Sequence, residues 1–520
     1  MLFNSYPFIF FFLPLTWLFF FSAAAKSHRL AATCLAFASL LFYGWWNPVY
    51  IGLLLGSIGF NYIFGAQIAR FRAAGRVKGA WLLLTIAVTA NLALLAQFKY
   101  ANFFISAWDQ MTGADWQLGP VLLPIGISFF TFTQITFLVD TYRGIVTEYK
   151  FLHYMLFVTY FPHLIAGPVL HHKEMMPQFS RTSTYRLKYR NLAVGLTMFV
   201  LGLAKKVLLA DNMLSYVRPV FDGPSGGMTT VLDGWGAALA YGLELYFDFS
   251  GYSDMAIGLS LMFNVKLPAN FNSPYKAVNI IDFWRRWHMT LSRFLRDYLY
   301  IPLGGNRKGP VRRYVNLLVT MLLGGLWHGA GWTFVVWGGL HGIYLMINHA
   351  WHALRRSLGN GSNQSTPAGE ALARVITFLA VTIAWVFFRA SNFGEAFGIL
   401  KGMVGLNGVV LPDSWLSKLG ELGSWLAAHN VQFSPNLVFG GSRQVVWTAA
   451  LLGIAWFMPN TQQLLARYVP VLEGTEGEGA KSVPRFAWQP RVVWALAVGV
   501  IGFVALSNLS KPHVFLYFQF

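Results

Sequence analysis

The feature that most constrains this chain is a succession of apolar stretches about as long as a bilayer is thick. A membrane-spanning helix needs ~20 mainly apolar residues, and several stretches here are shorter or interrupted. They lie near residues 6–25, 30–47, 48–66, 79–98, 119–139, 151–170, 191–216, 228–247, 252–265, 314–328, 331–349, 371–389, 444–459 and 490–508. We expect an all-α polytopic membrane protein with about ten to thirteen membrane segments, some re-entrant, in one domain over residues 1–520.

The composition excludes most other classes of protein. Only 11% of the residues are charged and 56% are hydrophobic, whereas roughly a quarter are charged in an ordinary soluble domain. This excludes a soluble enzyme and a disordered chain, and the single cysteine excludes an internal disulfide. The net charge of +19 indicates cytoplasmic loops that face anionic membrane lipids, with no nucleic-acid partner.

The distribution of basic residues predicts an orientation. Lys and Arg cluster in a few loops, which the positive-inside rule assigns to the cytoplasm. The densest cluster lies in 271–313, an expected cytoplasmic-side amphipathic or re-entrant region. Residues 390–443 are poor in Lys and Arg and are expected outside, in the periplasm, as is the aromatic tail 509–520.

Two short features predict interruptions of helices. Pro124 and Gly126 precede an aromatic run inside segment 119–139, so a break within the membrane is expected there. Glu244, Asp248 and Asp254 lie among aromatic residues near an expected helix break at Gly251. These carboxylates either orient a histidine, contact the basic helix or form structural ion pairs, and ion pairs are the commoner case.

His328 ends an apolar stretch within a glycine-rich segment, 324–331. Glycine allows a backbone or a ligand to approach closely, and a desolvated imidazole is neutral and can accept a proton. His328 is therefore either a general base in a glycine-lined channel or a histidine that hydrogen-bonds between helices. His341, on the next expected helix, either faces His328 or packs.

The segment 281–298 combines aromatic and basic residues. On a continuous helix, Phe283, Trp287, Leu291, Phe294 and Tyr298 share one face. Such an amphipathic helix either anchors the chain at the lipid surface or directs His288 into a tunnel while its arginines bind phosphates. The arginines concerned are Arg285, Arg286, Arg293 and Arg296. No metal site is expected.

These motifs resemble those of the membrane-bound O-acyltransferase family. The specific parts are 248–254, 283–298 and 326–329, and the segments 124–132 and 160–168 are also similar. The resemblance covers nearly the whole chain. It is closest to the branch that serves the O-acetylation of the bacterial exopolysaccharide alginate, and next to the branch that transfers D-alanine to teichoic acid.

The resemblance implies a fold and an activity. The fold is a ring of transmembrane and re-entrant helices around a central funnel or tunnel. The activity is an acetyltransferase of the bacterial inner membrane, with His328 as the essential histidine and His288 as the second motif histidine. No permanent cofactor is implied. The implied donor is acetyl-CoA or an acyl-carrier thioester, and the implied partners are periplasmic polysaccharide acetyltransferases and a cytoplasmic acyl-carrier protein.

The tail 513–520 resembles a C-terminal aromatic motif of this branch, with Tyr517 at its centre. One hypothesis is that Tyr517 accepts the acyl group covalently with the help of a base, because a phenol is a poor nucleophile near pH 7. The alternative is an interfacial aromatic anchor. Three alternatives to acetylation also stay open: D-alanyl or other acyl transfer, a transporter, and a scaffold for periplasmic enzymes.

Overall fold

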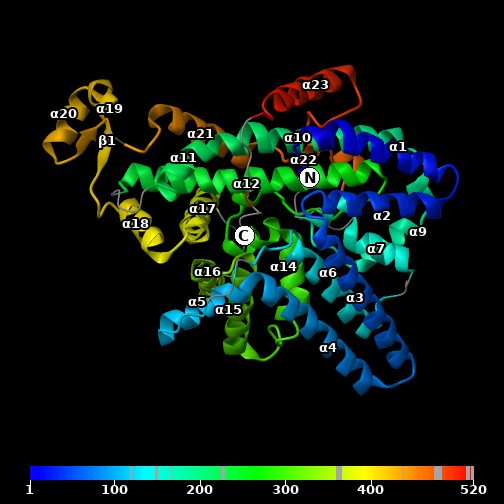
Figure 1. The fold of residues 1–520 in the computed structure, drawn as a ribbon. Coiled ribbons are helices and arrows are strands. Elements are labelled where there is room, and N and C mark those ends of the chain that lie inside the picture. The colour runs from blue at the N-terminus through cyan, green and yellow to red at the C-terminus, as the bar shows by residue number, and fades with distance from the viewer. Residues whose placement is uncertain are drawn as a thin grey trace. The chain divides into compact units, whose positions relative to one another are not determined.

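The computed structural model describes residues 1–520 except 117, 118, 120, 147–149, 166, 224–228, 359–365, 436, 473–482, 511–515 and 517–520. The chain packs into two compact units, which are described separately. Figure 1 labels their helices and strands. Unit 1 comprises Met1–Ala204, Gly251–Asn272 and Thr461–Pro512. Unit 2 comprises Lys205–Ser250, Ser273–Asn460 and His513–Phe520.

Unit 1 is helical in the part that the structure describes. Its α-helices are α1 (Leu13–Ala24), α2 (His28–Gly44), α3 (Val49–Ala73), α4 (Val77–Leu95), α5 (Ala101–Thr112), α6 (Ile127–Tyr142), α7 (Phe151–Thr159), α8 (Phe161–Leu164), α9 (His172–Ser180), α10 (Tyr189–Ala204), α22 (Thr461–Leu464) and α23 (Val492–Ser507). Short π or 3-10 turns are η1 (Phe8–Phe12), η2 (Ala96–Tyr100), η3 (Thr182–Tyr185) and η7 (Ala466–Tyr468). Helix α12 (Val231–Met262) contributes its C-terminal part to this unit.

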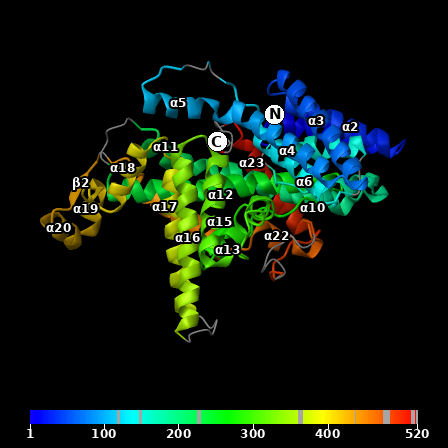
Figure 2. The ribbon, with the colours of Figure 1, turned by 90° about the horizontal axis from the view of Figure 1, so that it is seen from below.

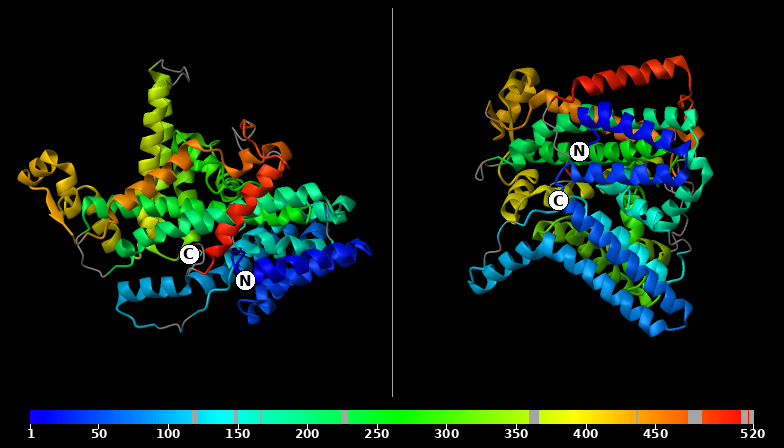
Figure 3. Two further views of the ribbon diagram at one scale, coloured as in Figure 1. Left: turned by 90° about the horizontal axis from the view of Figure 1, so that it is seen from above. Right: turned by 45° about the vertical axis from the view of Figure 1, so that its right-hand side comes forward.

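Glycines and buried amides hold the helices of unit 1 together. A Cβ on Gly195 or Gly202 of α10 would collide with backbone atoms of α12 at Gly258 or Gly251, so these glycines allow the two helices to touch. Between α3 and α4, the Asn61 and Asn91 amides donate to each other at 3.1 and 2.6 Å. Helix α23 packs on α10 (Figure 3).

Unit 2 holds the remaining helices and a small sheet. Its α-helices are α11 (Asp211–Phe221), the N-terminal part of α12, α13 (Ile280–Arg286), α14 (Met289–Leu295), α15 (Gly309–His328), α16 (Trp332–Ser357), α17 (Pro367–Arg389), α18 (Phe393–Met403), α19 (Asp413–Leu419), α20 (Glu421–Ala428) and α21 (Gly441–Phe457). Short turns are η4 (Lys205–Ala210), η5 (Pro274–Lys276) and η6 (Arg296–Tyr300). Strands β1 (Val410–Pro412) and β2 (Gln432–Ser434) pair in parallel, with Val410 opposite Gln432.

Helices α15 and α16 pack closely against each other in unit 2 (Figure 2). A Cβ on Gly325 would collide with the Phe334 carbonyl of α16, and one on Gly338 would collide with the Met321 carbonyl of α15. Because the two glycines lie against each other, the backbones touch. The glycines around His328 therefore serve helix packing.

The expected membrane character is supported by helix length and composition. Among the described residues, four helices are long and apolar enough to cross a bilayer: Val49–Ala73, Val77–Thr112, Tyr189–Phe221 and Pro367–Arg389. Phe8–Ala24 and Val492–Ser507 are apolar but shorter. The all-α fold class is thus confirmed apart from the short β1–β2 sheet. The ring around a funnel and the number of crossings stay predictions.

The expected interruption near Gly126 is found, its place within a membrane stays a prediction, and two other expectations were wrong. Helix α6 begins at Ile127, directly after Gly126, whose φ is +73°. Gly251 does not break a helix, because α12 runs unbroken for 32 residues and Gly251 serves contact with α10. The segment 283–298 is not one helix, because His288 adopts a left-handed conformation that separates α13 from α14.

Candidate active site

The α15–α16 hairpin of unit 2 fixes the position of His328. Helix α15 ends at His328, as expected, and Gly329 continues in an extended conformation. A Cβ on Gly329 would collide with the Phe334 ring, so the connection between the helices needs glycine there. His328 is therefore held at the end of a rigid helix pair.

Aromatic rings surround the His328 imidazole. Its ring centroid lies 4.9 Å from that of Trp327, 5.1 Å from that of Trp337 and 5.3 Å from that of Phe388, each edge to face. His328 is 6% exposed. The imidazole is thus largely shielded from water by aromatic rings, and electrostatic interactions there are stronger than in water.

His288 lies beside His328, although the two are far apart in sequence. The centroids of their rings are 6.4 Å apart, and the ring of Phe249 on α12 contacts His288 edge to face at 4.9 Å. His288 has φ +41° and ψ 53°, a left-handed backbone that costs a residue with a Cβ roughly 1–2 kcal/mol. Such strain concentrates at functional sites.

The protonation state of His288 follows from its burial. The side chain is inaccessible to solvent, and it lies between two seven-residue helices that are too short to cross a bilayer. Burial lowers the pKa of the imidazole to about 3. His288 is therefore neutral near pH 7 and offers one nitrogen as acceptor and one N–H as donor.

His341 on α16 occupies an aromatic box that shares Trp337 with the surroundings of His328. Its ring lies 4.9 Å from Trp337, 5.1 Å from Trp284 and 6.0 Å from Phe283, measured between centroids. It is fully buried, and neither ring nitrogen has a hydrogen-bond partner among the described residues. Of the two alternatives for His341, packing is the one that these contacts favour.

The four arginines proposed to bind phosphates differ in their surroundings. Arg286 pairs with Asp282 at 2.8 Å and Arg296 with Asp297 at 2.7 Å, so both have carboxylate partners on their own segment. Arg285 is exposed and Arg293 is half-buried. Their role in phosphate binding stays a prediction.

A buried ion cluster joins α12 to η4 and to α11, which directly follows η4. The Lys206 ammonium is 2.6 Å from the Asp211 carboxylate and 2.8 Å from that of Asp248, and Lys206 is 2% exposed. For Asp248, the ion-pair alternative is therefore the correct one. Sequence reasoning did not single out Lys206, although Lys205 and Lys206 are the only cations in the apolar stretch 191–216, and that signal could have found it.

Asp248 also holds the C-terminal segment. The backbone N–H of Leu516 donates to the second oxygen of the Asp248 carboxylate at 3.1 Å, and Leu516 is buried. The next residue after Asp248 is Phe249, which contacts His288. Tyr517, the candidate acyl acceptor, follows Leu516 and lies outside the described residues.

The arrangement suits proton transfer at a carbonyl compound. Two imidazoles lie together among aromatic rings. An imidazole at the end of a rigid helix can take a proton from a hydroxyl and return it to a leaving group. Of the three buried histidines of the pocket region, His328 is the one whose surface is accessible, at 6%, while His288 and His341 are at 0%.

Comparisons with known proteins agree with this chemistry. The membrane-bound O-acyltransferase family matches residues 76–388, which include His288 and His328. The chain is 47% identical to the peptidoglycan O-acetyltransferase of Helicobacter pylori over 79% of this chain and 81% of that protein. It is 38% identical to the probable alginate O-acetylase AlgI of Azotobacter vinelandii over 100% of both chains.

A more distant relative transfers a different acyl group. The teichoic acid D-alanyltransferase of Streptococcus thermophilus is 28% identical over 51% of this chain and 68% of that protein. The names of these relatives share acyl transfer and differ in the polymer. Family match, relatives and apolar helices agree that this chain is an acyltransferase and belongs to the membrane-bound O-acyltransferase family.

Proposed function

We propose that this acyltransferase moves acetyl groups from a cytoplasmic thioester across the bacterial inner membrane for the O-acetylation of a polysaccharide outside, with His328 as the general base. The observation that carries the proposal is that His328 is the accessible member of the buried histidine group and lies 6.4 Å from His288. Family membership favours an enzyme over a transporter or a scaffold.

The reaction balances through one proton on His328. A hydroxyl of the acceptor gives its proton to the imidazole as its oxygen attacks the thioester carbonyl. The C–S bond then breaks, and the imidazolium returns the proton to the departing thiolate. A new oxygen ester and a free thiol result. His288, neutral and fixed by Phe249, positions the reacting groups beside His328.

We propose further that the first acceptor is the phenol of Tyr517, which then passes the acetyl group outward. Support comes from its neighbour Leu516, whose buried backbone is bonded to Asp248, one residue before the ring that contacts His288. A phenol needs such a base because its ordinary pKa is near 10. Periplasmic polysaccharide acetyltransferases are the partners that would receive the group.

For the donor, we propose acetyl-CoA or an acyl-carrier thioester. An acyl-carrier protein would bring the latter to the cytoplasmic side. Two of the four arginines, Arg285 and Arg296, are exposed, and Arg296 is paired with Asp297. Arg285 is the exposed one that has no carboxylate partner among the described residues. It is therefore the first candidate for the donor's phosphates, because a guanidinium binds a phosphate through two parallel hydrogen bonds.

For the polymer, we propose alginate, because relatives that match the whole chain carry the name alginate O-acetylase. Peptidoglycan is the second candidate, because the Helicobacter pylori relative reaches 47% identity. Ester-linked acetate released by mild base from each polymer, in cells with and without the protein, distinguishes the two.

The test of His328 compares two buried histidines of the same unit. His328→Gln should lower acetate transfer by roughly 100- to 10,000-fold, the range of general acid–base catalysis. His341→Phe, which keeps an aromatic ring in the aromatic box, should retain most of the activity. Both are assayed in membranes at matched protein amounts. Equal losses in the two variants, or an active His328→Gln protein, would overturn the assignment.

The test of Tyr517 uses the mass of the intact protein. After incubation with isotope-labelled acetyl-CoA, the wild type should carry one labelled acetyl group on Tyr517, and His328→Gln should carry none. Tyr517→Phe should abolish polymer acetylation. Full polymer acetylation by Tyr517→Phe would leave the tail as an anchor without disturbing the role of His328.

A further inference from the structure

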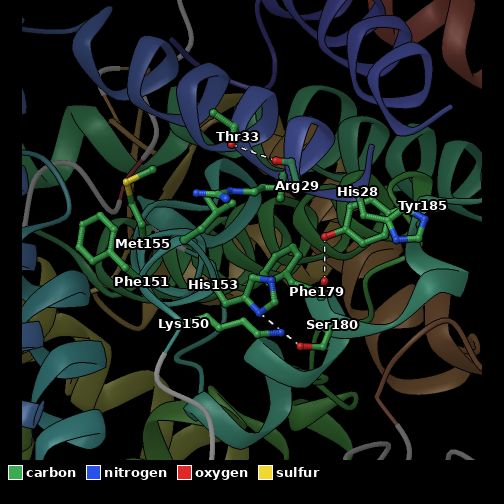
Figure 4. A pocket seen from close by; sticks show the side chains of 12 residues that line it. His28, Arg29, Thr33, Lys150, Phe151, His153, Met155, Phe179, Ser180 and Tyr185 are labelled. Carbon is green, nitrogen blue, oxygen red and sulfur yellow. Dashed lines mark hydrogen bonds between the residues drawn. The ribbon is translucent and has the colours of Figure 1, made fainter. Parts of the chain in front are cut away.

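Unit 1 contains a cavity of about 710 Å³. Its lining residues lie between 28 and 185, whereas His288 and His328 belong to unit 2. It lies between the start of α2, the start of α7, the end of α9 and η3 (Figure 4). The volume falls in the range of small-molecule sites. A ligand of moderate size therefore fits.

The polar lining of the cavity is basic. Arg29 reaches into it from α2, and Lys150 and His153 border it on the opposite side (Figure 4). His28 adds a second imidazole, and among the described lining residues none carries a carboxylate. The charge of the lining therefore favours an anion.

Neighbouring groups hold the two imidazoles in place. The His28 ring stacks on Tyr185 with centroids 4.6 Å apart and an interplanar angle of 12°. The Tyr185 hydroxyl donates to the Phe179 carbonyl at 2.7 Å. On the other side, the Ser180 hydroxyl lies 3.3 Å from Nδ1 of His153. Because these partners fix both rings, little side-chain freedom is lost when a ligand binds.

The rest of the lining is apolar. Ala32, Phe151, Leu152, Met155 and Phe179 contribute hydrocarbon surface next to the basic groups. A small inorganic anion would leave this surface uncovered, whereas a ligand that carries a chain would bury it. The lining thus matches an amphiphilic anion.

We propose that this cavity binds a phosphate ester that carries an apolar chain. Arg29 and Lys150 hold the phosphate through charge-assisted hydrogen bonds, and the apolar lining receives the first part of the chain. The source with this chemistry is an anionic membrane phospholipid, because the pantetheine arm of coenzyme A carries two polar amides and its acetyl group only two carbons. The inference does not depend on the histidine group.

The experiment measures binding to the full-length protein purified in detergent. Native mass spectrometry follows the titration with phosphatidylglycerol and with phosphatidylcholine, and calorimetry follows the titration with coenzyme A. The variant Arg29→Ala/Lys150→Ala removes both strong cations and should weaken binding of the true ligand at least tenfold, about 1.4 kcal/mol. Both side chains are exposed, so the variant should fold.

A matched control removes the same charge elsewhere in unit 1. Lys78→Ala/Arg190→Ala also takes away two exposed cations, and it should leave binding unchanged. Loss of phosphatidylglycerol binding in the cavity variant alone identifies a phospholipid, whereas loss of coenzyme A binding alone would contradict a ligand with an apolar chain. If the cavity variant binds both probes as the wild type does, or if the control loses binding equally, the proposal is wrong.

A second variant tests the apolar side without changing charge. Met155→Trp puts a larger ring into the cavity and should weaken binding of the same probe at least tenfold. Unchanged binding in this variant would contradict a ligand whose chain enters the cavity, even if the cation variant failed to fold.

Discussion

Unit 2 buries an ion cluster around Lys206 and a histidine group around His328, and the surroundings of the two differ. Around Lys206, one ammonium is matched by the carboxylates of Asp211 and Asp248 at 2.6 and 2.8 Å. Around His328, the imidazole meets rings of Trp, Phe and His. The first group balances charge internally, and the second places imidazoles among aromatic rings.

This contrast separates structure from chemistry. A buried cation with two buried carboxylates cannot easily lose or exchange a partner. Removing any of the three would leave an uncompensated charge in a medium of low dielectric constant, which is energetically costly. A neutral imidazole can gain and lose a proton during a reaction. The ion cluster is therefore structural and holds Leu516, while the histidine group is suited to acyl transfer.

The largest effect that tests this contrast is expected from Lys206→Met. It leaves Asp211 and Asp248 buried without their cation and should lower the free energy of unfolding by roughly 3–5 kcal/mol. Thermal unfolding in detergent measures it. Lys205→Met, at the half-buried neighbour, is the control and should cost far less.

A compensated variant sharpens the same test. Lys206→Met combined with Asp211→Asn and Asp248→Asn removes the uncompensated charges and should recover much of the lost stability. The amide introduced by Asp248→Asn retains an oxygen that can accept from the Leu516 N–H. If the triple variant is as unstable as Lys206→Met alone, the cluster acts through something other than charge balance.

A smaller effect is expected at the helix pair that carries His328. Gly338→Ala puts a Cβ against the Met321 carbonyl and should destabilise the protein by roughly 1–3 kcal/mol, with a parallel loss of acetate transfer. Gly339→Ala makes the same change one residue on, where the nearest atom is Leu322 Cδ2 at 3.4 Å. That control should be neutral or stabilising by up to about 1 kcal/mol.

Taken per pH unit, the smallest effect is a change in pH dependence at His288. The unfolded histidine has a pKa near 6.5, whereas burial lowers the pKa in the folded protein to about 3. Between these values the unfolded chain binds the extra proton, so stability falls as the pH decreases, by up to about 1.4 kcal/mol per pH unit. His288→Gln should show a shallower fall between pH 6.5 and 4.5 in thermal unfolding. Parallel curves for wild type and variant would show that His288 is not a buried neutral base.

Sequence patterns predicted the features that depend on neighbouring residues. Helix α6 begins directly after Gly126, and helix α15 ends at His328, directly before Gly329. Glycine next to an apolar run marks such a boundary. The same rule failed at Gly251. A glycine that interrupts a helix cannot be distinguished in a single sequence from one that lets two helices touch.

The site was predictable in its residues and not in its geometry. An ionisable residue within an apolar run identified His328, and the same criterion applied to Lys206 would have found the ion cluster. The left-handed backbone of His288 was hidden, because the positions of Phe283, Trp287 and Leu291 fit a continuous helix and all three are buried. The contact of His288 with His328 depends on tertiary packing, which the spacing of the motifs does not encode.

The bond between Leu516 and Asp248 joins residues 268 positions apart, and this has a consequence for biosynthesis. A ribosome that adds about 5–20 residues per second needs roughly 13–54 seconds to extend the chain from one residue to the other. Until Leu516 has left the exit tunnel, the carboxylate lacks this partner. Newly made protein should therefore reach its final arrangement only late in translation or after it, however early its helices enter the membrane.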